Sequence, residues 1–180
     1  SSIVSKHHVT DIDVYIKSFT EAFNAFYGTF NDYVILALLP SYLERNGSSL
    51  VYMVDYLIKH SNHRDRGFPW QGGDDLKTQL TQLDKTKKVL LIGVSFALLD
   101  LVEDYEFELK NTIVMETGGM KGRRKELVRQ ELHDILKNGF GVTTIHSEYG
   151  MTELLSQAYS KGHGKFTCPS WMQVSIRDIN

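Results

Sequence analysis

The chain has 180 residues, a formal net charge of −2 at neutral pH and 42% hydrophobic residues. This length and apolar content suit one domain with a sizeable core. The nearly balanced charge gives no electrostatic reason to expect a nucleic acid or a membrane surface as partner. The single cysteine, Cys168, excludes a disulfide within the chain and fits a reducing cytoplasm, where we expect the protein to reside. The longest apolar run, residues 33–40, is too short to span a bilayer.

The N-terminal part predicts a helix, a strand and a second helix. Apolar residues recur at helical spacing over 12–27, after a capping pattern formed by Thr10 and Asp13, and Gly28 is the expected stop. Residues 33–39 are continuously apolar, which is typical of a parallel strand buried on both faces. A turn at 46–49 then precedes a helix over 50–60.

The middle of the chain predicts a long loop over 61–75 and a short helix over 75–83. Residues 88–94 form a second buried strand. The next helix covers 96–104, with Ser95 as its N-cap.

The C-terminal part predicts strands over 113–115 and 142–145 on either side of an amphipathic helix over 124–138, which Gly139 closes. The apolar positions of this helix are expected to face inward; they are Val128, Leu132, Ile135 and Leu136. Residues 172–177 alternate like an edge strand or a half-exposed strand. Strands that alternate with helices indicate an α/β fold with a mainly parallel sheet flanked by helices.

Two polar loops each follow a β-branched run. Residues 116–120 (Glu-Thr-Gly-Gly-Met) follow the run at 111–115, and residues 147–153 (Ser-Glu-Tyr-Gly-Met-Thr-Glu) follow the run at 141–145. One helix separates them, so both loops are expected at the carboxyl ends of neighbouring parallel strands. Open α/β sheets bind their ligands at such ends.

The side chains of the second loop suit a nucleotide. The Thr152 hydroxyl can contact a phosphate oxygen, and the Glu153 carboxylate can bind Mg²⁺, which prefers oxygen ligands. Tyr149 offers a flat face to a base, and Gly150 allows close approach of the backbone. In the first loop, Gly118 and Gly119 carry no side chain that would block a planar ring.

Each of these patterns also has a purely structural interpretation. Thr152 can be the N-cap of a helix after an ordinary turn, and Gly118-Gly119 can be a turn that needs positive φ. The cationic run at 121–125 is either a phosphate patch or a solvated helix start. Histidines at 60, 63, 146 and 163 are metal-ligand types, but a zinc site often includes cysteines and the chain has no cysteine pair.

The second loop resembles a known motif. Residues 149–153 match the Tyr-Gly-x-Thr-Glu pattern of the adenylate-forming enzymes, which include acyl-CoA synthetases and peptide-synthetase adenylation domains. Residues 115–122 and 146–148 more specifically resemble the acyl-protein synthetases of bacterial bioluminescence, the long-chain-fatty-acid–luciferin-component ligases. Residues 5–9 fit the segment that follows the phosphate-binding loop of that family.

The resemblance implies ATP-dependent activation of a long-chain fatty acid as an acyl adenylate, with Mg²⁺, followed by transfer to a protein thiol. It implies catalytic roles for Thr152 and Glu153, with Glu153 as the metal ligand, and a substrate-pocket role for Tyr42. The residues that it implies for nucleotide binding are Gly118, Gly119, Met120, Ser147, Glu148, Tyr149 and Gly150.

The same resemblance implies that residues 1–180 are the central portion of the large N-terminal domain of such an enzyme. The family's phosphate-binding loop, its ribose-binding Asp and its C-terminal lid with a catalytic Lys have no counterpart in the chain. We therefore expect the fragment alone to be inactive and to form a homodimer through exposed sheet edges. An acyl-carrier or reductase protein is a further expected partner. The alternatives are an aryl- or acyl-CoA ligase of the phenylacetate-CoA ligase type, and a non-catalytic nucleotide-binding or assembly module.

Overall fold

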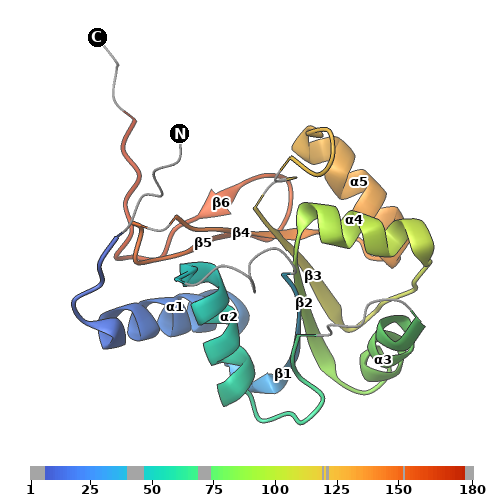
Figure 1. Cartoon of the computed structure of the whole chain (residues 1–180), viewed down its shortest axis with the longest axis horizontal. Helices are drawn as coiled ribbons and strands as arrows, with labels where there is room; N and C mark the ends of the chain where they lie inside the picture. Colours follow the sequence, from blue (N-terminus) through green and yellow to red (C-terminus); the bar gives the residue numbers. More distant parts are fainter. Residues whose placement is uncertain are drawn as a thin grey trace.

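The fold is an α/β sandwich around one mixed sheet. The computed structural model describes residues 7–39, 47–68, 74–118, 120, 122–151 and 153–176. The sheet has six strands in the order β1-β2-β3-β4-β5-β6 (Figure 1). The elements follow one another as α1 (Ile12–Tyr27), η1 (Phe30–Asp32), β1 (Tyr33–Leu38), α2 (Ser49–His60), α3 (Asp74–Asp84), β2 (Lys88–Val94), α4 (Ser95–Asp104), β3 (Thr112–Thr117), α5 (Arg129–Phe140), β4 (His146–Tyr149), β5 (Ala158–Ser160) and β6 (Phe166–Thr167).

The first four strands are parallel and confirm the predicted sheet type. In the centre of the sheet, Leu91 of β2 pairs with Leu36 of β1 and with Val114 of β3, and all three side chains are buried. α1 and α2 lie on one side of these strands, and α3, α4 and α5 lie on the other (Figure 1). Both faces are therefore covered, which is why β1 and β2 read as unbroken apolar runs.

The caps of the first two helices are local. The Asp11 side chain accepts the backbone N–H of Asp13 at the start of α1, so Asp11 takes the capping role predicted for Thr10. Gly28 ends α1 with a φ of 78°, as expected for a glycine stop. Ser48 caps α2 by accepting the N–H of Val51.

α5 begins later than predicted, at Arg129 instead of residue 124. The preceding segment is tied to α4, because Arg124 forms ion pairs with Asp100 and Glu103. Leu132 and Leu136 are buried as predicted, whereas Val128 is 73% exposed and Ile135 is 40% exposed, so the prediction was wrong for those two. The helix runs on to Phe140 and ends at Gly141, which has a φ of 66°.

The predicted glycine stop of α5, Gly139, instead allows close helix packing. A Cβ on Gly139 would lie 2.4 Å from the Cβ of Val102 on α4. Glycine is therefore needed at this position for α4 and α5 to approach each other, and not to end the helix.

The C-terminal part of the sheet is antiparallel and was not predicted. β4 pairs with β5, and β5 pairs with β6, both antiparallel. The strand expected over 142–145 lies a few residues further on, over 146–149. This polar strand is stable in the interior because its side chains find partners there, as described below. Residues 172–176 form no strand, contrary to the prediction.

Among the described residues, no helix is both long and apolar enough to cross a bilayer.

Candidate functional site

The carboxyl ends of β3 and β4 lie side by side. Glu116 pairs with Ser147 and Thr117 pairs with Glu148 across the two parallel strands. The polar stretches predicted as loops at 116–120 and 147–153 therefore begin at adjacent points at one end of the sheet, as expected from their order in the chain. Their first residues, 116–117 and 147–149, belong to the strands themselves.

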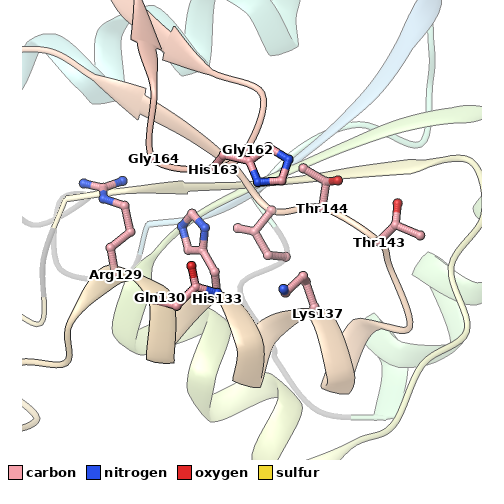
Figure 2. A pocket seen from close by; sticks show the side chains of 10 residues that line it. Arg129, Gln130, His133, Lys137, Thr143, Thr144, Gly162, His163 and Gly164 are labelled. Carbon is pink, nitrogen blue, oxygen red and sulfur yellow. The ribbon is translucent and has the colours of Figure 1, made fainter.

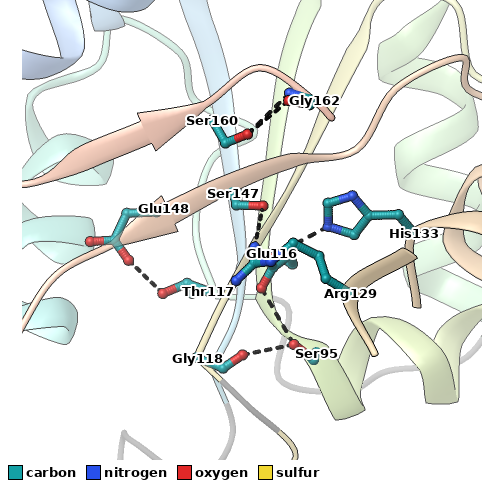
Figure 3. A network of polar contacts seen from close by, with 10 residues as sticks. All are labelled: Ser95, Glu116, Thr117, Gly118, Arg129, His133, Ser147, Glu148, Ser160 and Gly162. Carbon is teal, nitrogen blue, oxygen red and sulfur yellow. Dashed lines mark hydrogen bonds and ion pairs between the residues drawn. The ribbon is translucent and has the colours of Figure 1, made fainter. Parts of the chain in front are cut away.

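A hydrogen bond between buried side chains ties the two strand ends together. The Thr117 hydroxyl donates to Glu148 Oε2 at 2.5 Å (Figure 3). Burial raises the pKa of Glu148 to about 7; the Thr117 hydrogen bond opposes this rise and the charge of Glu116 adds to it. A carboxyl group in such an apolar setting is easier to keep neutral than ionised.

Glu116 organises a second set of contacts on the other side of β3. Its Oε1 accepts from Arg129 Nη1 at 2.6 Å and lies 3.5 Å from His133 Nε2 (Figure 3). The same Arg129 nitrogen donates to Ser147 Oγ at 3.0 Å. Arg129 at the start of α5 therefore links the ends of β3 and β4, and this link explains how polar residues occupy the interior strand β4.

A side chain of α4 holds the start of the first loop in place. The Ser95 hydroxyl donates to the carbonyl oxygen of Gly118 at 2.7 Å and lies 3.5 Å from Glu116 Oε2. Ser95 was predicted to cap α4, but it is the first residue of that helix and makes no cap hydrogen bond there. Gly118 is exposed and has a φ of 69°, a conformation that favours glycine.

The second loop presents its side chains to solvent. Tyr149 is 42% exposed and packs edge-on against Phe166 of β6, with ring centroids 6.0 Å apart. Gly150 is also exposed, and a Cβ there would lie 2.8 Å from Glu148 Oε1. Glu153 is exposed and begins no helix, so the described part of the loop does not form the helix start considered from sequence.

The predicted nucleotide-binding residues fall into two groups. Gly118, Tyr149 and Gly150 are exposed at the strand ends, and the predicted metal ligand Glu153 is exposed in the turn that follows β4. The remaining described ones are buried and support the loops from within; they are Met120, Ser147 and Glu148. Tyr42, Gly119 and Thr152 lie outside the residues that the structure describes.

Sequence reasoning missed the residues that hold the site together. Arg129 and His133 are one helical turn apart on α5, and this spacing was the available signal. Two residues of the predicted cationic run have partners elsewhere, since Arg124 pairs with carboxylates of α4 and the Arg123 guanidinium lies 4.9 Å from the ring centre of Phe96.

The described residues contain no group of three or more His, Cys, Asp or Glu side chains that converge on one point. Mg²⁺ is often held by one or two carboxylates together with substrate phosphates and water. The exposed carboxylate of Glu153 is an oxygen ligand of this kind.

Comparisons with known proteins give little more. No family model matches the chain, and no curated protein sequence matches it. Among solved structures, a mutant form of coronafacic acid ligase from Pectobacterium brasiliense aligns with 18% identity and a TM-score of 0.44, over 73% of this chain and 24% of that one. The chain thus spans about a quarter of the length of that ligase. At this distance the likeness carries no argument about function.

Proposed function

We propose that this chain is part of a ligase that activates a carboxylic acid with ATP as an acyl adenylate. The observation that carries the proposal is the meeting of the two loops at neighbouring strand ends, joined by the bond from Thr117 to Glu148. One of these loops contains the Tyr-Gly-x-Thr-Glu pattern, and both begin where parallel sheets bind ligands.

In this proposal each site residue contacts a different part of the ligand. Tyr149 faces the adenine ring, and Gly118 with Gly119 leaves room for the ring to lie along the backbone. Glu153 binds Mg²⁺, and Thr152 contacts a phosphate. Tyr42 lines the pocket for the acid. The buried contacts of Thr117 with Glu148 and of Arg129 with Glu116 hold the loops in place, so that the ligand does not have to order them on binding.

The reaction itself requires positioning and charge stabilisation. An oxygen of the substrate carboxylate attacks the α-phosphorus of ATP, a new P–O bond forms, and the bond to the bridging oxygen breaks so that pyrophosphate leaves. Mg²⁺, when bound, neutralises charge on the phosphate oxygens. The protein holds the two reactants in line and stabilises developing charge.

The finer proposal concerns the acid and the acceptor. The match of residues 115–122 and 146–148 to the acyl-protein synthetases supports a long-chain fatty acid and transfer to a protein thiol, with an acyl-carrier or reductase protein as partner. An aryl- or acyl-CoA ligase is the alternative, and coenzyme A is then the acceptor.

The test is ATP–pyrophosphate exchange with the gene product as encoded, measured with and without a panel of fatty and aromatic acids. We expect exchange that needs both an acid and Mg²⁺. Glu153→Gln removes the metal-binding charge and is expected to lower the rate by about 100-fold or more, in the range lost when one transition-state contact is removed. Glu106→Gln is the matched control, because Glu106 is exposed between α4 and β3, before the first residue of that strand.

The outcomes separate the candidate functions. Exchange with a fatty acid favours the acyl-protein synthetase, and exchange with an aromatic acid favours the CoA-ligase type. ATP binding without exchange by any acid contradicts the ligase and supports a nucleotide-binding module. Equal rates for Glu153→Gln and Glu106→Gln contradict the role given to Glu153.

A further inference from the structure

A group of buried polar side chains lies beneath the start of the second loop, on the face of the sheet that α1 covers. Its members are Thr117, Glu148, Gln157 and Tyr15. They belong to β3, β4, the residue just before β5, and α1. The proposed function gives no role to Gln157 or to Tyr15. Buried polar side chains of this kind need hydrogen-bond partners, and their partners show what they hold together.

Gln157 connects this group to two helices. Its Nε2 donates to the Tyr15 hydroxyl at 3.3 Å, and that hydroxyl donates to the carbonyl oxygen of Ser49 at 3.1 Å. Tyr15 belongs to α1, and Ser49 is the first residue of α2. Gln157 therefore ties both helices to the segment that follows the second loop.

The backbone of the second loop rests on two side chains of this group. A Cβ on Gly150 would lie 2.8 Å from Glu148 Oε1 and 3.5 Å from Gln157 Nε2. The carboxyl group of Glu148 and the amide group of Gln157 thus lie next to the same point of the backbone. A change in the hydrogen bonds of either group changes the support of Gly150.

Glu148 has no positive charge beside it. Ser147 contacts Arg129 on the α5 side of β4, so Glu148, the next residue of the strand, points to the opposite face (Figure 3). The cations of α5 line a cavity on their own side of the sheet (Figure 2). None of the ion pairs between described residues includes Glu148.

The other titratable groups that face Glu148 cannot neutralise it. The charge of Glu116 on β3 disfavours ionisation of Glu148. Burial raises the pKa of Tyr15 to about 12 and the pKa of Tyr159 well above its usual value, so both phenols stay neutral. An ionised Glu148 would be a buried charge without an opposite partner, which is unfavourable. A proton on Glu148 removes this penalty.

The same proton satisfies a second group. Gln157 Oε1 is buried and has no hydrogen-bond partner among the described residues. Glu148 accepts from Thr117 with Oε2, which leaves Oε1 to carry the proton. A protonated Oε1 is a donor, and the amide oxygen of Gln157 is the acceptor that lacks one.

We propose that Glu148 is protonated in the folded protein and donates to Gln157 Oε1, and that Gln157 is a positioning residue that couples the second loop to α1 and α2. The hydrogen bonds then run in one direction, through Thr117, Glu148, Gln157, Tyr15 and Ser49. When Glu148 ionises, the Gln157 amide turns to offer Nε2 to the carboxylate, and Tyr15 loses its donor. The effect on nucleotide binding rests on the proposed function, whereas the pairing of Glu148 with Gln157 does not.

The test follows backbone amide signals in NMR spectra of the gene product as encoded, from about pH 5.5 to 8.5 and without nucleotide. The signals of Gly150 and of Leu50, whose amide belongs to the same peptide group as the Ser49 carbonyl, should shift with one shared midpoint. That midpoint should equal the pKa of Glu148, about 7. Glu148→Gln has a permanent amide donor at this place and should remove both shifts.

The variant Gln157→Met separates coupling from packing. It has no amide group, so the Gly150 signal should still titrate with Glu148 while the Leu50 signal no longer does. Gln82→Met, at an exposed position of α3, is the matched control and should behave like the unmodified protein. A Gly150 signal that does not titrate would overturn the protonation of Glu148. A Leu50 shift that persists in Gln157→Met would overturn the coupling.

ATP binding extends the test to the proposed function. Between about pH 6 and 8.5, the affinity of the unmodified protein for ATP should fall by about fivefold or more relative to that of Glu148→Gln. An equal pH dependence in the two proteins would contradict the positioning role in nucleotide binding. The amide titrations use no nucleotide, so a failed exchange assay contradicts the ligase alone, and missing titrations contradict the pairing alone.

Discussion

The two halves of the sheet differ in the polarity of their buried side chains. β1 to β3 carry side chains such as Leu36, Leu91 and Val114, which are buried and apolar and need no specific partner. At the ends of β3 and β4 the buried positions are polar, and each depends on a specific partner, as Glu148 does on Thr117. The apolar half contributes hydrophobic stabilisation. The polar half contributes less of it, because buried polar side chains must be hydrogen-bonded, and those bonds hold the side chains in fixed places.

The largest expected effect measures how much the apolar half contributes to the free energy of unfolding. Leu91→Ala opens a cavity in the central strand and should lower the free energy of unfolding by about 2–5 kcal/mol. Denaturant titration measures this loss. Val128→Ala is the control, because Val128 is 73% exposed and its truncation should change stability by less than about 0.5 kcal/mol. Equal losses would contradict the assigned core.

The next prediction uses pH to measure how much a buried carboxyl group in the polar half of the sheet destabilises the fold. The pKa of Glu148 rises from 4.5 to about 7 in the folded protein, chiefly through burial. Its contribution to stability is therefore fully present below pH 4.5 and is lost as the pH rises through 7. The loss amounts to about 3 kcal/mol.

The variant Glu148→Gln isolates this effect. The difference in unfolding free energy between the unmodified protein and the variant should fall by that amount between about pH 4.5 and 8. Glu131→Gln, at an exposed position of α5, should leave the pH profile unchanged. A pH-independent difference for Glu148→Gln would mean that Glu148 is not buried as described.

A smaller effect concerns the N-terminal end of β3, where a buried carboxylate accepts hydrogen bonds from three groups. Asp84 accepts the N–H groups of Lys110 and Asn111 at 2.9 and 2.8 Å and the Thr112 hydroxyl at 2.6 Å. Asp84→Asn replaces an acceptor oxygen by a donor and should cost about 1–3 kcal/mol in thermal or denaturant unfolding. Asp75→Asn, an exposed change on α3, should cost almost nothing. A neutral Asp84→Asn would show that this end of β3 is held by packing alone.

The last effect has the opposite pH dependence, because it destabilises the protein at acidic pH. Burial, together with the charge of Lys161, lowers the pKa of His146 from 6.5 to about 4. The stability linked to neutral His146 is therefore present above pH 6.5 and is lost as the pH falls toward 4. His146→Gln should remove that acid-side loss, which denaturant titrations at pH 7.5 and pH 4.5 would show. An unchanged acid-side slope would contradict it.

The same difference explains what the sequence could predict. The strands at 33–38 and 88–94 were recognised because continuous apolar runs have few alternatives to a buried strand. β4 was placed too early, at 142–145, because its own residues are polar and are stable inside through partners distant in sequence, such as Arg129 and Thr117. β5 and β6 are short and depend on pairing with β4 and with each other, which no local pattern encodes.

The site was predictable to a similar extent. The polar stretches 116–120 and 147–153 were placed together from their order in the chain, and the structure shows their strands as neighbours. The side chains that fix them are distant in sequence, with Ser95, Glu116 and Arg129 on three different elements. Such contacts follow from tertiary packing, so sequence periodicity alone did not reveal them.

The central claim is that both loops bind one nucleotide, and photolabelling tests it most directly. The gene product is irradiated with a photoreactive azido-ATP and Mg²⁺, with and without excess ATP, and the labelled peptides are identified by mass spectrometry. We predict that ATP-protected label falls within 118–122 or 149–153 and is lost in Glu153→Gln. Protected label confined to α1 and α2, or no protected label on folded protein, would contradict the account.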